Sequence, residues 1–230
     1  MQLSHMKLDR QGPVWILCLQ HPEKDITLTP PVLAEWMHCL DQIESHADQA
    51  SLLIHSTHPK TWCNGIDLSW FMTQEEPAIL RFMADFEDLL LRLSLLSVPT
   101  LASITGNCYA GGALLAAACD FRFMRQDRGR FCFSEIKVKI PFTPCMFTVL
   151  QQLPHPQAIW QLALTGNALS ALDAQELKLL DRVYPEEILF HESLKFAETM
   201  AEKHRATYTI IKQGLRQKTH DLWKTRQAQQ

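Results

Sequence analysis

The sequence lacks the motifs that would identify a metal, nucleotide or serine-hydrolase site. It has seven cysteines in 230 residues, but no two are spaced as CxxC, and no HExxH run occurs among its ten histidines. The runs GxGxxG, GxxxxGK[ST] and GxSxG are also absent. Zinc binding, phosphate binding by a Rossmann turn or P-loop, and a nucleophile elbow therefore have no support in the sequence.

The sequence also has little net charge and no long apolar run. The formal net charge is −3, which favours neither nucleic acid nor an acidic membrane surface as a partner. No apolar run approaches the roughly 20 residues that span a bilayer. The first ten residues are too polar for a secretory signal, and the final Gln-Ala-Gln-Gln is not a peroxisomal signal. Because the cysteines are odd in number and scattered, we expect no disulfides and a reducing, cytoplasmic location.

With 47% apolar residues, the chain can form one compact domain with a sizeable core. Apolar segments typical of buried strands span residues 14–19, 51–55, 98–104, 121–124, 131–133 and 181–184. Helical patterns span residues 29–45, 77–96, 113–118, 144–153, 156–164, 170–177 and most of the chain from 186. We expect Thr29 to cap the first helix and Gly12-Pro13 to form a hairpin turn. Short strands separated by helices predict an α/β fold.

Two glycine-containing turns are the most informative feature of the sequence. Gly111 and Gly112 follow an apolar strand and open a short helix, whose first N–H groups are free to bind an anion or an oxygen that becomes one. A second turn, Asn64-Gly65, follows Trp62-Cys63. The N–H groups of Ile66 and Gly111 are candidates to converge on one carbonyl oxygen. Taken singly, either turn is better explained as an ordinary packing turn, and only the two together make the functional interpretation comparably strong.

Three acids lie near these turns. Glu135 follows the apolar run 131–133, where partial burial would raise its pKa and suit it to act as a base. The alternative is a solvated Glu135, or one paired with Lys137. We expect Asp67 to pin its loop by accepting backbone N–H groups. Asp120 follows a helix C-terminus, where the dipole disfavours an anion, so we expect it to have a structural partner.

Four stretches, taken together, resemble the crotonase, or enoyl-CoA hydratase/isomerase, superfamily. They are Leu19–Lys24, Trp62–Leu68, Ile104–Ala113 and Phe131–Ile136, the last followed by Pro141. They occur in the family's order, and the likeness extends from about Val14 to Tyr184. The resemblance implies a fold built as a spiral of ββα units.

The resemblance also assigns roles to the residues of these stretches. It implies that the N–H groups of Ile66 and Gly111 form an oxyanion hole and that Glu135 is the catalytic acid–base. No metal and no cofactor are implied, since the coenzyme A thioester is itself the substrate. The residues that the resemblance places against the substrate are Lys24, Ile26, Asn64, Gly65, Asp67, Leu68, Ala110 and Leu114. For the phosphates of coenzyme A, Lys24 is the first candidate and Lys60 the second.

One departure from the family pattern bears on the reaction. Hydratases of this family use two glutamates, and the first would fall on Leu114, which cannot transfer a proton. A single glutamate is the arrangement of the Δ3,Δ2-enoyl-CoA isomerases of fatty acid β-oxidation. Two alternatives stay open. One is another acyl-CoA enzyme, such as a weak hydratase, a thioesterase or a decarboxylase; the other is a non-catalytic acyl-CoA-binding protein. Ala110 and Ile26 also depart, standing where many members have glycine and asparagine.

The resemblance finally implies a domain division and an assembly. Residues 1–185 would form the crotonase-like core, and residues 186–230 a helical region that packs in a trimer. We therefore expect a homotrimer or hexamer that binds a small acyl-CoA molecule and neither nucleic acid nor membrane.

Overall fold

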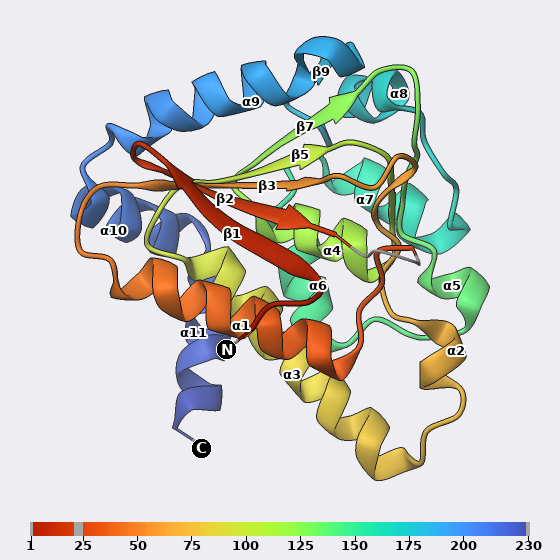
Figure 1. The fold of residues 1–230 in the computed structure, drawn as a ribbon. Coiled ribbons are helices and arrows are strands. Elements are labelled where there is room, and N and C mark those ends of the chain that lie inside the picture. The colour runs from red at the N-terminus through yellow and green to blue at the C-terminus, as the bar shows by residue number, and fades with distance from the viewer. Residues whose placement is uncertain (1, 21–24, 229–230) are drawn as a thin grey trace.

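The computed structural model describes residues 2–20 and 25–228, which form two sheets surrounded by helices (Figure 1). The larger sheet has the strand order β1 (Met6–Gln11), β2 (Val14–Leu19), β3 (Ser51–Ser56), β5 (Thr100–Ile104), β7 (Phe121–Arg125) and β9 (Arg182–Tyr184). The smaller sheet has the order β4 (Thr61–Cys63), β6 (Asn107–Tyr109) and β8 (Phe131–Cys132). β1 and β2 form an antiparallel hairpin around Gly12-Pro13, as predicted, and every other pairing is parallel.

The chain alternates between the two sheets, which confirms the predicted spiral of ββα units. β3, β5 and β7 of the larger sheet are followed by β4, β6 and β8 of the smaller sheet. A helix comes next each time: α2 (Leu68–Phe71) and α3 (Glu76–Leu95), then α4 (Gly111–Ala118), then α5 (Glu135–Val138). Because β4, β6 and β8 are parallel neighbours, the turns at their carboxyl ends lie side by side. Such an edge is where α/β sheets place their ligands.

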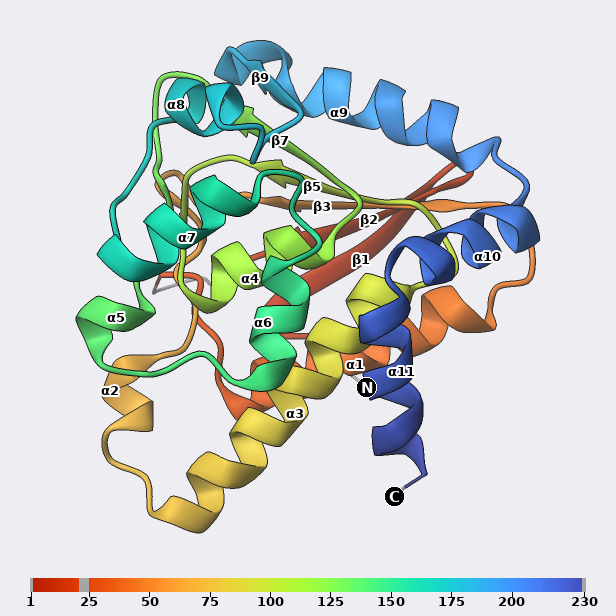
Figure 2. The same cartoon turned by 180° about the vertical axis from the view of Figure 1, so that it is seen from behind.

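The remaining helices cover both faces of the larger sheet. They are α1 (Pro30–Ser45), α6 (Pro144–Leu150), α7 (Pro156–Thr165), α8 (Ala171–Glu176), α9 (Glu186–Ala201), α10 (Arg205–Leu215) and α11 (Gln217–Gln227). α9 crosses one face, in contact with β3, β5 and β7, while α1, α3 and α4 lie on the other (Figure 1). Figure 2 shows α10 and α11 returning beside α3. The helices from residue 186 onward thus pack against the rest of the same chain. The division into two regions at residue 185 stays a prediction.

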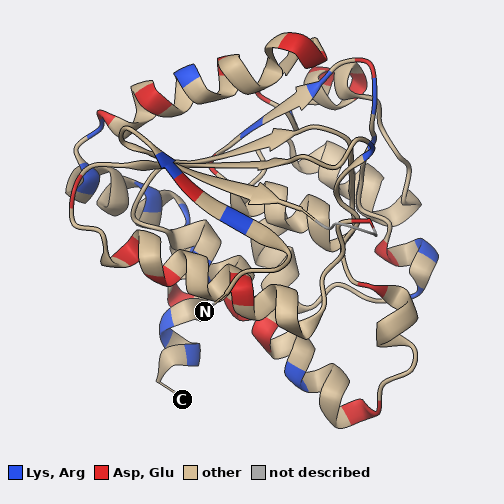
Figure 3. Ribbon diagram, in the orientation of Figure 1, with Lys and Arg blue, Asp and Glu red and all other residues tan. Residues whose placement is uncertain are grey.

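The charges follow this layering. β3, β5 and α4 contain no charged residue, whereas β1 and the outer helices carry most of the coloured positions in Figure 3. Strands covered by helices on both faces are expected to be apolar throughout. β1 is an edge strand with only Met6 buried, and its polar residues face water.

Five short elements were not predicted from the sequence: β1, β4, β6, α2 and α5. In β1 apolar and polar residues alternate only weakly, because most of its residues are exposed. The other four elements are only three or four residues long. Thr29 is the N-cap residue of α1, but the expected side-chain cap hydrogen bond is not formed. The two prolines at the start of α1 reduce the need for it, because proline brings no N–H group to satisfy.

All seven cysteines are buried and free. Burial raises the pKa of Cys39, Cys63, Cys119 and Cys145 to about 12, so these thiols stay protonated. Over residues 2–20 and 25–228, no helix combines the length and the apolar character that crossing a bilayer would require.

Candidate active site

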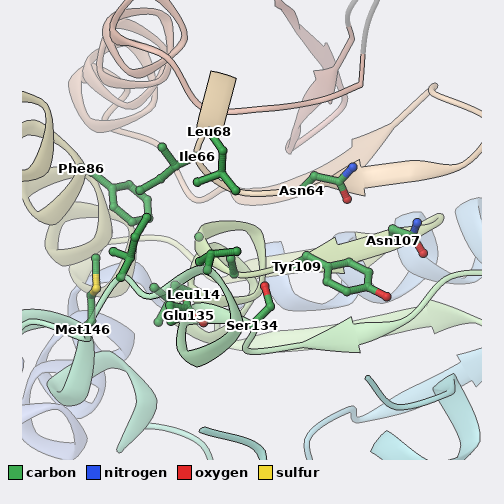
Figure 4. A pocket seen from close by; sticks show the side chains of 14 residues that line it. Asn64, Ile66, Leu68, Phe86, Asn107, Tyr109, Leu114, Ser134, Glu135 and Met146 are labelled. Atoms are coloured by element: carbon green, nitrogen blue, oxygen red, sulfur yellow. The ribbon is translucent and has the colours of Figure 1, made fainter. Parts of the chain in front are cut away.

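A cavity of about 340 Å³ opens at the carboxyl ends of β4, β6 and β8 (Figure 4). The turns after these three strands contribute Asn64 and Ile66, Ala110 and Gly111, and Ser134 and Glu135. The spiral thus brings together segments that are some 70 residues apart in the sequence. The complete lining is Asn64, Ile66, Leu68, Phe86, Asn107, Tyr109, Ala110, Gly111, Leu114, Ser134, Glu135, Val138, Ile140 and Met146.

The first turn is held by the segment at residues 26–28. The N–H of Asn64 donates to the carbonyl of Ile26 at 2.8 Å, and the N–H of Leu28 donates to the carbonyl of Gly65 at 2.8 Å. The first bond fixes the residue before the Gly65–Ile66 peptide group, and the second fixes the carbonyl of that peptide group, whose N–H belongs to Ile66. That N–H has no acceptor among the described residues, and Ile66 lines the cavity. It is therefore a free donor at a fixed position.

The second turn presents the first peptide of α4. Ala110, the residue before the helix, has φ +47° and ψ −121°, a conformation that costs a non-glycine residue about 1–3 kcal/mol. A glycine at this position would adopt the same conformation without that cost. Gly111 begins the helix, and its N–H likewise has no acceptor in the described part of the chain. All eight residues of α4 are buried, so water does not compete along the helix.

Glycines let the two turns stack backbone on backbone. A Cβ on Gly65, which has φ +78°, would lie 2.7 Å from the Gly111 nitrogen. A Cβ on Gly112 would lie 2.1 Å from the carbonyl oxygen of Cys63. Neither space admits a side chain, because the opposing atoms belong to the backbone. The proximity of the Gly65 and Gly111 backbones places both free N–H groups at one side of the cavity.

Glu135 is the first residue of α5 and is buried, with 5% of its surface exposed. Its Oε2 has no hydrogen-bond partner among the described residues. Burial away from water raises the pKa of this carboxyl to about 7. The alternative pairing with Lys137 is not formed in the described residues. A carboxylate whose pKa lies near neutrality can both accept and return a proton.

The cavity has a polar end and an apolar end. Figure 4 shows Asn64, Asn107 and Tyr109 at one end and Phe86 and Met146 at the other. The acid and the glycine turns lie between the two ends. The arrangement suits a ligand with a polar part, a central carbonyl and an apolar tail.

Seven residues predicted for the site line the cavity: Asn64, Ile66, Leu68, Ala110, Gly111, Leu114 and Glu135. Three others support it from behind. Ile26 is buried and accepts the Asn64 N–H, Gly65 forms the turn, and the Asp67 side chain accepts the Trp70 N–H at 3.0 Å as the N-cap of α2. That cap confirms the pinning role expected of Asp67. Lys24 lies outside the described residues, and Lys60 is exposed.

The sequence reasoning missed the other seven residues that line the cavity. They are Phe86, Asn107, Tyr109, Ser134, Val138, Ile140 and Met146. Phe86 belongs to the apolar face of α3 that the periodicity reveals, but periodicity does not distinguish a residue facing a cavity from one facing the core. Asn107 and Tyr109 lie on β6, a strand too short to predict.

Comparison with known proteins gives a consistent result. Residues 9–230 match the enoyl-CoA hydratase/isomerase family. The chain is 29% identical over 217 residues to enoyl-CoA delta isomerase 3 of Arabidopsis thaliana, covering 90% of each protein, and 27% identical over 219 residues to the peroxisomal enoyl-CoA delta isomerase 2 of the same plant, again covering 90% of each. The crystal structure of an enoyl-CoA hydratase from Bacillus halodurans superposes with a TM-score of 0.86 at 19% identity, over 98% of this chain and 92% of that one.

Proposed function

The chain belongs to the enoyl-CoA hydratase/isomerase family, and on that premise we propose that it is a Δ3,Δ2-enoyl-CoA isomerase. The observation that carries the choice is the single carboxylate of the site. Among the described residues that line the cavity, Glu135 is the only Asp or Glu. Leu114, where a hydratase of this family has its other glutamate, is completely buried and lines the same cavity. Two relatives that are named as delta isomerases align over 90% of the chain, which supports the same choice.

The first step is removal of a proton from C2 of the 3-enoyl thioester. The thioester oxygen accepts the N–H groups of Ile66 and Gly111, which polarise the carbonyl and acidify the C2 proton. Glu135 takes this proton, and the C2–H electron pair moves into the conjugated dienolate. The negative charge collects on the thioester oxygen, where the two donors and the N-terminus of α4 stabilise it.

The second step returns the proton at C4. The Glu135 carboxylic acid donates its proton to C4, and the dienolate electrons form the C2–C3 double bond as the C3–C4 double bond is lost. The carboxylate is regenerated, so no other acid or base is consumed. One carboxylate suffices because the proton leaves and re-enters on the same face of the dienolate.

The apolar wall of the cavity favours isomerisation over hydration. Hydration needs a water molecule that is held and deprotonated next to C3. The side chains of Leu114 and Phe86 offer no hydrogen bond to such a water, and the Met146 thioether is only a weak acceptor. Their burial also keeps the dielectric constant low around the dienolate, which strengthens its attraction to the two N–H donors.

The proposal predicts the dependence of rate on pH. Glu135 must be ionised to act as a base, and its pKa is raised to about 7. kcat/KM is therefore expected to rise about tenfold per pH unit below pH 7 and to level off above it. Initial rates with 3-hexenoyl-CoA between pH 5 and 9 measure this profile. A base with an ordinary carboxyl pKa would instead give a flat profile over this range.

The same carboxylate is predicted to destabilise the folded protein. In the unfolded chain it ionises near 4.5, but in the folded protein only near 7, so the folded state binds more protons between these values. The free energy of unfolding therefore falls as the pH rises from 4.5 to 7. Glu135→Gln removes this loss and is expected to be more stable than the wild type at pH 8, by an amount on the order of 2–3 kcal/mol.

Urea unfolding at pH 5 and pH 8 measures this difference. The gain of Glu135→Gln should be large at pH 8 and small at pH 5. Glu198→Gln, which alters an exposed position of α9, is the matched control and should show no gain at either pH. An equal gain for Glu135→Gln at both pH values would contradict the burial of an ionised carboxylate.

A panel of acyl-CoA esters tests the proposed function itself. Purified protein is incubated with 3-hexenoyl-CoA, 2-hexenoyl-CoA and hexanoyl-CoA, and the products are followed by chromatography. We expect 2-trans-hexenoyl-CoA from the 3-enoyl ester, with little hydration of the 2-enoyl ester and no release of free coenzyme A. Faster hydration would identify a hydratase, and hydrolysis a thioesterase. Tight binding without turnover would identify a binding protein.

A further inference from the structure

A buried ionic cluster lies at the end of α4 that is farthest from the cavity. Asp120 follows this end of the helix, and its carboxylate lies 2.7 Å from Lys212 Nζ and 3.1 Å from Arg216 Nη2. It also accepts the N–H of Thr100 and the hydroxyl of Tyr208, each at 2.9 Å. The side chains of Asp120 and Lys212 are 8% and 4% exposed. The structural partner predicted for Asp120 is thus confirmed, and the site described above does not use it.

Two arginines donate to carbonyls at the C-terminal end of α4, those of Ala118 and of the C-cap residue Cys119. Arg216 donates through Nη1 to the carbonyl of Ala118 at 2.9 Å and through Nη2 to that of Cys119 at 3.1 Å. Arg122 donates through Nη1 to the same Cys119 carbonyl at 2.9 Å. The last carbonyls of a helix have no hydrogen-bond partner within the helix. A cation is favourable there because the C-terminal end of the helix dipole carries a partial negative charge. The C-terminal end of this helix therefore receives two guanidinium groups in place of water.

We infer that Arg216 is a positioning residue for the reaction at the other end of α4. The helix is eight residues long, about 12 Å, and it begins with the Gly111 N–H. Fixing its last carbonyls fixes the direction in which its first N–H points. The cation also favours the alignment of peptide dipoles that makes the N-terminus positive. This inference rests on the proposed function, because it assigns Arg216 to the support of the proposed oxyanion donor.

Arg216 donates to a carbonyl of α4, whereas two other cations of the C-terminal helices bind elsewhere. Arg226, at the end of α11, pairs with Glu87 at 2.7 Å and Asp88 at 2.6 Å on α3. Lys212 donates to the carbonyls of Leu96 and Val98, which precede β5. These contacts hold the C-terminal helices without touching α4. Arg226→Gln therefore loosens the same helical region while leaving the α4 cap intact, and it is the matched control for Arg216→Gln.

The test compares these two variants by kinetics and by infrared spectroscopy. Each is assayed with 3-hexenoyl-CoA below its unfolding temperature. The carbonyl stretch of bound hexanoyl-CoA, labelled with ¹³C at the thioester, reports how strongly the two N–H donors polarise the carbonyl. We expect Arg216→Gln to lose roughly 3- to 30-fold in kcat with little change in KM. Its carbonyl stretch should move back toward that of the free ester, whereas Arg226→Gln should match the wild type in both measurements.

Other results have a defined meaning. Equal effects of Arg216→Gln and Arg226→Gln, or an unshifted carbonyl stretch in Arg216→Gln, overturn the inference. Arg216→Lys, which keeps the charge but lacks the planar guanidinium whose two Nη atoms reach separate carbonyls, replaces Arg216→Gln if that variant does not fold, and an intermediate stretch is then expected. A wild type that polarises the carbonyl without isomerising the 3-enoyl ester overturns the proposed isomerase function alone. A wild type that does not polarise the carbonyl removes the oxyanion site and the inference with it.

Discussion

Glu135→Gln is expected to lower kcat for isomerisation by about 10²–10⁴, the contribution that a positioned acid–base group makes. Glutamine has nearly the shape of glutamate but cannot accept the C2 proton. Among the described residues that line the cavity, the other side chain that can ionise is Tyr109. Burial raises the pKa of Tyr109, so it stays protonated and cannot serve as the base.

Stopped-time assays with 3-hexenoyl-CoA measure this loss, and calorimetric titration with hexanoyl-CoA measures binding. The affinity of Glu135→Gln should stay within a few-fold of the wild type, because the ester is neutral around C2 and the donors Ile66 and Gly111 are unchanged. Glu198→Gln, on the surface of α9, should keep full activity. Isomerisation by Glu135→Gln at the wild-type rate would show that another group is the base.

Gly111→Pro is expected to lower kcat by about 10²–10³, the usual cost of losing one oxyanion donor. Proline removes the N–H of Gly111 and suits the first position of a helix, but its ring also restricts the backbone of the preceding Ala110, which has φ +47°. Gly111→Ala is the matched control. A Cβ at this position would lie 3.1 Å from the Phe86 ring, 3.2 Å from Leu28 Cδ1 and 3.3 Å from the Gly65 Cα, so the two side chains must shift by a few tenths of an ångström to admit it. Alanine adds the same Cβ and keeps the donor.

Comparing the two variants separates loss of the N–H group from addition of the Cβ, which both variants carry. Because the proline ring also adds a Cδ on the nitrogen of residue 111, circular dichroism must show that each variant is folded before the difference in kcat is assigned to the lost donor. We expect Gly111→Ala to lose less than tenfold and Gly111→Pro to lose much more. Equal losses in the two variants would mean that crowding, and not the N–H, explains the effect.

Much of the fold could be predicted from the sequence because its larger elements have strong local signals. The apolar period of α3 and the prolines at the start of α1 set their positions to within one residue. Two strands of the smaller sheet, β4 and β6, could not be predicted, since three residues contain no period. They form because parallel neighbours satisfy their backbone groups, and this depends on the tertiary structure.

The candidate site shows the same division. The turns at Asn64-Gly65 and Gly111-Gly112 and the acid Glu135 stand out in the sequence because their backbone geometry or chemistry requires particular residue types. The walls of the cavity do not, since Phe86 and Met146 differ in no sequence property from the core residues beside them. Asn107 and Tyr109 were missed because the direction in which a side chain points from β6 depends on pairing with β4 and β8.

The position of the two N–H donors and the preference for the acyl chain depend on different parts of the cavity. The backbone of each turn packs against that of the other, with Gly65 against Gly111 and Gly112 against Cys63. A substitution that moves one N–H donor therefore also disturbs the other turn. Single substitutions are therefore poorly tolerated in the middle of the cavity, where the carbonyl would bind. Phe86 and Met146, at the apolar end, are ordinary side chains on separate helices. Preference for the length or branching of the acyl chain is free to vary through them while the chemistry stays the same.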